Sequence, residues 1–188
     1  DRGPRAFLDA YVARARPLRR THGETYWRFA LGSDAALQER LEQLEGELSD
    51  LHADASTYAA LCRWRADSAD DALLARQLDL LVLEHRQAQV DEGLRTQIIK
   101  LSLELEEVFT AFRPLVQGQR MSSNQLDRAL VVEHDDARRR AVWEGTRAIG
   151  AEVRDRMVQL AMLRNEQARS LGFDDYFALA LANQEMAP

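Results

Sequence analysis

The sequence predicts an all-α fold, a multi-helix bundle with at most one short β-hairpin near residues 114–121. Three observations support this. The 188 residues include only 9 glycines and 4 prolines, so helices can run long. Apolar residues recur at spacings of three and four along most of the chain. Side chains that cap helix N-termini stand ahead of many of these periodic segments.

The first predicted helices are rich in aromatic residues. Gly3-Pro4 suits a helix start, because proline is tolerated in the first helical turn. Pro17 is expected to end or bend this helix. Thr21 is then expected to cap a second helix, which reaches Gly32 and carries three large aromatic side chains: Tyr26, Trp27 and Phe29.

Two shorter segments follow. Ser33-Asp34 is expected to cap a helix whose leucines form a heptad-like seam from Leu37 to Leu51. The seam covers about two heptads, which favours a packed helical pair over a free coiled coil. Ser56 is expected to begin the next helix, which contains Cys62. A lone cysteine cannot form an internal disulfide, and we interpret it as a small buried apolar residue.

Residues 72–90 and 91–113 predict two long helices. The second, capped by Asp91, has the cleanest amphipathic pattern in the chain and ends at Arg113-Pro114. Three glutamates on it, Glu104, Glu106 and Glu107, are interpreted as a solvated face rather than as paired catalytic acids. The sequence LVQGQRM then predicts the hairpin, with Gly118 in its turn.

The last third of the chain predicts four more helices. Ser122–Asn124 caps the first, and Asp135-Asp136 caps the second, which carries Trp143. A long helix follows, with an apolar face that includes Met157 and Ala161. Gly172 ends it and Asp174 is expected to cap the next helix.

A polar group is predicted at the junction of the last two helices. Arg164 falls on the apolar face of the long helix, and a buried charge needs a partner. Asp174 or Asp175, after the Gly172 turn, can supply that partner. Arg164, Asn165 and Asp174 are therefore predicted to form a structural polar lock.

Two patterns in this region carry a resemblance. They are Trp143-Glu144-Gly145 and the later run R-N-x-x-A-R-x-L-G-F-D-D-Y that ends at Tyr176. Together they resemble the N-terminal half of zinc metallopeptidases of the angiotensin-converting-enzyme and oligopeptidase kind, the gluzincins. The resemblance extends more weakly to Thr25–Gly32 and Phe109–Arg113. It implies one helical domain over residues 1–188 that forms the lid and cleft wall of an enzyme hydrolysing short peptides.

The resemblance also implies zinc in the parent enzyme. Such enzymes hold zinc with an H-E-x-x-H helix, whose histidines at i and i+4 share one face. The histidines here are His22, His52, His85 and His134, and none has a second histidine four residues later. We therefore expect no catalytic residue, no metal ligand and no cofactor in these 188 residues, which would be inactive alone. By resemblance to the animal converting enzymes, Arg147 is a candidate anion-site residue.

Composition limits the remaining possibilities. The net charge of −6 argues against nucleic acid and anionic membranes as partners of the whole surface. The expected partners are the catalytic half of the same protein and, in the parent, a short peptide. No apolar run approaches the ~20 residues of a membrane span, and we expect a cytoplasmic protein. Secretion stays open, because the start at Asp1 looks cut. The alternative function is a non-enzymatic helical scaffold or interaction domain.

Overall fold

The protein is an elongated arrangement of helices in two layers, as the computed structural model describes for residues 3–32 and 34–186. These residues form nine helices and one two-stranded hairpin, which confirms the predicted all-α fold. Their bounds are α1 Pro4–Leu31, α2 Ala35–Ala53, α3 Ala55–Asp67, α4 Ala72–Gln87, α5 Glu92–Ala111, β1 Leu115–Val116, β2 Gln119–Arg120, α6 Ser123–Val132, α7 Asp136–Arg147, α8 Ile149–Ser170 and α9 Tyr176–Asn183.

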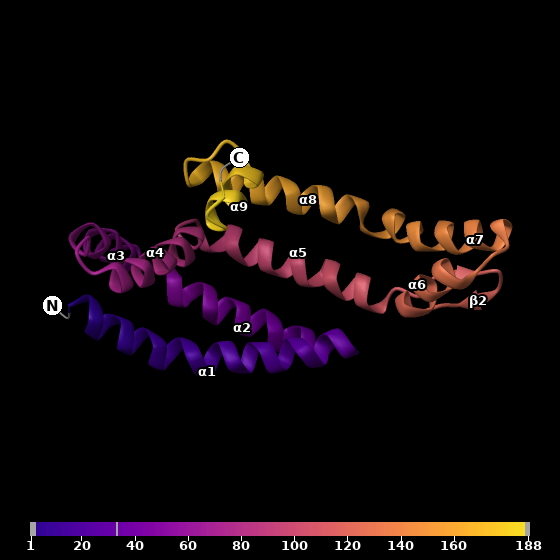
Figure 1. Cartoon of the computed structure of the whole chain (residues 1–188), viewed down its shortest axis with the longest axis horizontal. Coiled ribbons are helices and arrows are strands. Elements are labelled where there is room, and N and C mark those ends of the chain that lie inside the picture. Colours follow the sequence, from indigo (N-terminus) through magenta and orange to yellow (C-terminus); the bar gives the residue numbers. More distant parts are fainter. Residues whose placement is uncertain (1–2, 33, 187–188) are drawn as a thin grey trace.

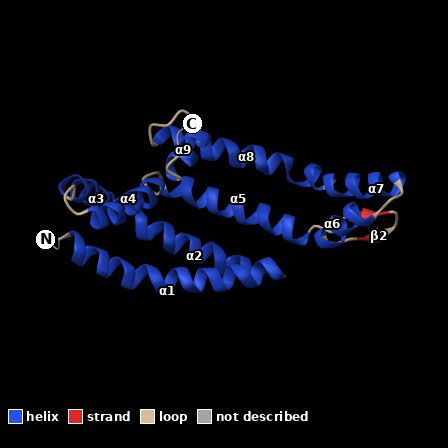
Figure 2. Ribbon diagram, in the orientation of Figure 1, coloured by secondary structure: helices blue, strands red, loops and turns tan. Residues whose placement is uncertain are grey.

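The two layers are helical pairs joined along their middle. Helices α1 and α2 pack together as one layer, α5 and α8 pack together as the other, and α2 also packs on α5. Phe29, Leu41 and Leu103 form the apolar cluster between the layers. Helices α3 and α4 lie near the N-terminus, while the hairpin, α6 and α7 lie at the opposite end (Figures 1 and 2). We call residues 115–147, from β1 to α7, the tip.

Four predictions about the N-terminal helices are wrong in detail. Pro17 does not end α1, since one helix of 28 residues runs through it, and the alternative that Pro17 bends this helix stays a prediction. Pro17 is exposed, so water can reach the backbone acceptor that proline leaves unpaired. Thr21 is no cap, because its hydroxyl donates to the Pro17 carbonyl at 3.1 Å. Asp54, rather than Ser56, caps α3, and Cys62 is exposed because Leu61 takes the core position.

The predicted caps of α2, α5, α6 and α7 are confirmed. Asp34, Asp91 and Asp135 accept hydrogen bonds from the third residue of their helices, while Ser33 lies outside the described residues. Ser122 and Gln125 form a reciprocal capping box at α6. In the hairpin, Leu115 pairs with Arg120 and Val116 with Gln119. Gln117 and Gly118 have φ of 48° and 85°, which is the backbone of a tight two-residue turn.

Helix α8 buries a narrower face than its sequence predicts. Val153, Leu160 and Ala168 are buried, whereas Met157 is 51% exposed and Ala161 is exposed too. The reason is that α8 packs against a single neighbour, α5, along most of its length. No helix within the described residues is long and apolar enough to cross a membrane.

Candidate functional site

The Trp-Glu-Gly sequence of α7 lies where the helix touches the hairpin. A Cβ atom added to Gly145 would stand 2.6 Å from Cγ2 of Val116, which is closer than two carbon atoms can approach. Gly145 therefore lets β1 pack directly on α7. Val116, Leu126 and Val142 form the buried apolar cluster of the tip around this contact.

A cavity of about 610 Å³ opens beside Gly145. Its walls come from the C-terminal end of α5, from the hairpin, and from the junction of α7 with α8. Arg113 and Arg120 line it together with Glu107 and Glu152. Arg113 donates to the Thr110 and Phe112 carbonyls at 2.8 and 2.7 Å, so this arginine also closes the C-terminus of α5.

Arg147, the candidate anion-site residue, lies one turn after Trp143 on α7. Its guanidinium carbon stands 5.4 Å from the centre of the Trp143 ring, within the range of a cation–π contact. Trp143 is 49% exposed, so this pair lies at the surface. Glu144 of the same motif accepts a hydrogen bond from Arg140 at 2.8 Å.

Two of the three residues predicted to form a polar lock, Arg164 and Asn165, contact the start of α9. Asn165 accepts the Tyr176 backbone N–H at 2.9 Å. The Arg164 guanidinium carbon lies 5.0 Å from the Tyr176 ring centre, and Arg164 donates to the Ser102 hydroxyl at 3.3 Å. The N-cap of α9 is Asp175 rather than Asp174. Tyr176 is thus the shared contact of Arg164 and Asn165, and the role of Asp174 in the lock stays a prediction.

A second group of polar residues was not found from the sequence. We call Tyr11, Arg19, His52, Glu84 and His85 the polar hub. The Tyr11 hydroxyl lies 2.8 Å from His52 Nε2 and donates to Glu84 Oε2 at 2.8 Å. Arg19 donates to both the Tyr11 oxygen and Glu84, at 2.9 and 2.7 Å. The His52 and His85 ring centres are 4.7 Å apart.

Burial shapes the electrostatics of the polar hub. His85 is 1% exposed, and its Nδ1 lies 2.9 Å from the Leu81 carbonyl oxygen. Burial lowers the pKa of His52 to about 4, and the neighbouring His85 and Arg19 act in the same direction. Burial also lowers the pKa of His85. Burial and the Glu84 carboxylate raise the pKa of Tyr11. At neutral pH both imidazoles are therefore uncharged.

The histidines do not converge on a metal position. Among the described residues, no group of three His, Cys, Asp or Glu side chains is arranged to hold a metal ion. His22 is bound to Glu45 at 2.6 Å, His52 to Tyr11 and His85 to a carbonyl oxygen. The donor set of a catalytic zinc, three protein ligands around an open position, is not met by these residues.

A family model described as angiotensin-converting enzyme matches residues 2–187 of the chain. The chain belongs to the angiotensin-converting enzyme family. Searches of curated proteins and of solved structures gave no match. The described helices therefore form a peptidase-related helical domain.

Proposed function

We propose that these 188 residues are the N-terminal helical part of a zinc-dependent metallopeptidase that hydrolyses short peptides. They form a single domain that serves as lid and cleft wall, and the zinc ligands belong to another part of the same protein. The family match over residues 2–187 supports the peptidase assignment. The lack of an H-E-x-x-H motif in these residues supports a structural rather than a catalytic role for them.

The observation that carries this proposal is the size of the exposed surface. A compact protein of 21.4 kDa is expected to expose roughly 9,100 Å². This chain exposes 12202 Å². The excess is several times the ~800 Å² that each partner contributes to a standard protein–protein interface. A chain with this much surplus surface is best explained as one part of a larger folded unit.

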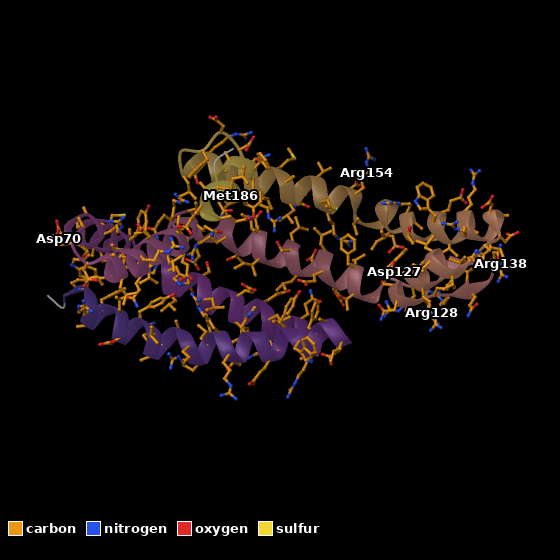
Figure 3. All side chains as sticks on the ribbon, viewed as in Figure 1. Asp70, Asp127, Arg128, Arg138, Arg154 and Met186 are labelled. Carbon is orange, nitrogen blue, oxygen red and sulfur yellow. The ribbon has the colours of Figure 1, made fainter. Side chains whose placement is uncertain are left out.

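The character of the exposed surface supports the same proposal. Val158 and Met162 lie on the outer face of α8, with exposed fractions of 55% and 68%. Arg154, one turn before Val158, points away from α5 in Figure 3 and marks this face. Other large apolar side chains are exposed elsewhere on the surface, among them Trp27, Leu31 and Phe177. Neighbouring apolar groups on an uncovered helix face are typical of an interface.

The domain's contribution to the reaction would be steric and electrostatic. Two layers of long helices form a stiff wall, since α2 and α5 are joined by buried apolar side chains. Such a wall can hold a short peptide extended beside a catalytic centre and exclude folded proteins. The arginines and glutamates around the tip cavity are the charged groups available to a peptide there. No bond-breaking step is assigned to this chain's residues.

The test uses the full gene product and the 188-residue chain side by side. We expect the full product to carry one zinc per chain and to cleave a short fluorogenic peptide in a chelator-sensitive way. A full product without zinc and without peptide hydrolysis would contradict the proposal. That result would favour the alternative, a non-enzymatic helical interaction domain.

A further inference from the structure

The polar hub connects three helices through side chains that are far apart in sequence. Tyr11 and Arg19 come from α1, His52 from the last turn of α2, and Glu84 and His85 from α4. Tyr11 also belongs to the apolar cluster that joins α1 to α3 and α4, with Leu61 and Leu78. Titratable groups therefore stand at the edge of the core that holds the N-terminal helices together.

The hydrogen bonds of His52 to Tyr11 and of His85 to Leu81 need only one proton on each imidazole, whereas the Leu48 backbone acts in the other direction and favours a charged His52. Tyr11 has one proton, which it donates to Glu84, so the His52–Tyr11 bond requires the proton on His52 Nε2. His85 donates from Nδ1 to the Leu81 carbonyl. Its Nε2 is buried without a hydrogen-bond partner. A second proton on His85 would therefore create a buried N–H group with no acceptor.

The charges around the two histidines act in both directions, since Arg19 opposes protonation of His52 and Glu84 favours it. From α1, Arg19 is cationic; from α4, Glu84 is anionic and already bonded to Arg19 and Tyr11. Glu45 of α2 and Arg95 of α5 line the same cavity of about 350 Å³ as His52 and Glu84. Glu45 is bound to His22, and Arg95 to Ser49 and Asp50.

One more carboxylate, Asp54 at the end of α2, acts on His85 and favours its charged form, as Glu84 does. Burial outweighs both carboxylates, so the pKa of His85 stays lowered. Within the described residues, no charged group of α3 or α8 forms a hydrogen bond or an ion pair with the hub. A new imidazolium at His52 would therefore share the Glu84 carboxylate with Arg19.

We propose that the polar hub is an acid-operated latch, in which proton uptake by His52 and His85 releases the α1–α2 pair from α4. In the closed form the hub is intact and its two imidazoles stay neutral. In the open form α1 and α2 have separated from α4, and the solvated imidazoles can each bind a second proton. Acidification therefore shifts the balance toward the open form. This device does not depend on the proposed peptidase function.

The direction and size of the effect follow from proton linkage. The pKa of His52 is about 4 in the closed form and 6.5 when the side chain is solvated. Above pH 6.5 neither form binds the extra proton, and the latch is at full strength. As the pH falls from 6.5 toward 4, only the open form binds it, and the opening equilibrium rises. His52 alone gives a rise of roughly 20-fold between pH 7 and pH 5.

The test is hydrogen–deuterium exchange followed by peptide-resolved mass spectrometry, corrected for intrinsic exchange rates, between pH 7 and pH 5. We expect protection of α1 around residues 11–19 to fall about tenfold or more. Protection of the tip, around residues 116–142, should change much less, and it serves as the internal control. The full gene product is measured in the same way as the 188-residue chain.

Three variants make the outcome decisive. His52→Gln and the double variant H52Q/H85Q keep polar groups in place but cannot take up the proton, so the pH dependence of α1 protection should shrink stepwise. His134→Gln, at an exposed position outside the hub, should behave like the unmodified protein. Unchanged pH dependence in H52Q would overturn the proposal, and so would full protection of α1 at pH 5 in the unmodified chain.

Discussion

The two ends of the molecule are held together in different ways. At the tip, apolar packing around Val116 and Val142 is combined with local backbone devices, namely a tight turn, a capping box and the close approach at Gly145. At the N-terminal end, a comparable apolar cluster is bordered by the polar hub. The first end is expected to be insensitive to mild acid and the second to depend on it. One end of a protein can thus lose stability in mild acid while the other end keeps it.

The largest expected effect is the loss of apolar packing beneath the polar hub. Leu78 is fully buried in the N-terminal cluster, and Leu78→Ala should cost about 2–5 kcal/mol of unfolding free energy. Leu73→Ala is the matched control, because Leu73 lies on the same helix, α4, and its side chain is 70% exposed. Urea unfolding checks both. Equal losses in the two variants would show that α4 does not pack as described.

The second prediction removes a single oxygen from the hub. Tyr11→Phe leaves the His52 Nε2–H and an Arg19 donor without their shared acceptor, at an expected cost of about 1–3 kcal/mol. Tyr26→Phe is the control, because the Tyr26 hydroxyl binds Glu106 at an exposed position and its loss should cost much less. Thermal unfolding at pH 7 measures the difference. A neutral Tyr11→Phe variant would mean that the hub adds nothing to stability.

The third prediction concerns the tip. Gly145→Ala places a methyl group against Val116, and overpacking of this kind costs about 1–3 kcal/mol. Alanine has a higher helix propensity than glycine, which offsets about 1 kcal/mol of this cost. The expected net loss of unfolding free energy is therefore about 1 kcal/mol. Val116→Ala in the same chain should remove most of that loss. Gly150→Ala, with open space around it, should instead stabilise α8, and a double-mutant cycle by urea unfolding separates these outcomes.

The smallest expected effect is at Arg147. Arg147→Ala removes a surface cation–π contact with Trp143 and should cost about 0.5 kcal/mol. Arg147→Lys keeps a positive charge and should lose less. Tryptophan fluorescence during unfolding reports on both. A loss of several kcal/mol would assign Arg147 a buried structural partner that the described contacts do not include.

The same comparison explains which features the sequence predicts. The tip depends on chemistry between residues a few positions apart, such as Ser122 with Gln125 or the Gln117-Gly118 turn, and such patterns are legible in the sequence. The polar hub is assembled by bonds between Tyr11 and residues 41 and 73 positions later. A lone histidine carries no local signal of that contact, and so the hub was missed.

The errors in the predicted helices have the same origin. Pro17 is a helix breaker by local propensity, but packing of α1 against α2 outweighs that preference over 28 residues. Met157 fits the apolar period of α8, yet no neighbouring helix in the described structure covers it. Periodicity predicts which residues share a face. It does not predict whether another element packs there.

We propose that this chain is the wall of a peptidase whose zinc ligands lie elsewhere. The most direct measurement is hydrolysis of a short fluorogenic peptide in zinc-containing buffer. It compares the 188-residue chain alone, the remaining part of the gene product alone, and their mixture. We predict chelator-sensitive cleavage in the full product and in the mixture, and none by the 188-residue chain. Chelator-sensitive cleavage by the 188-residue chain alone would contradict the account.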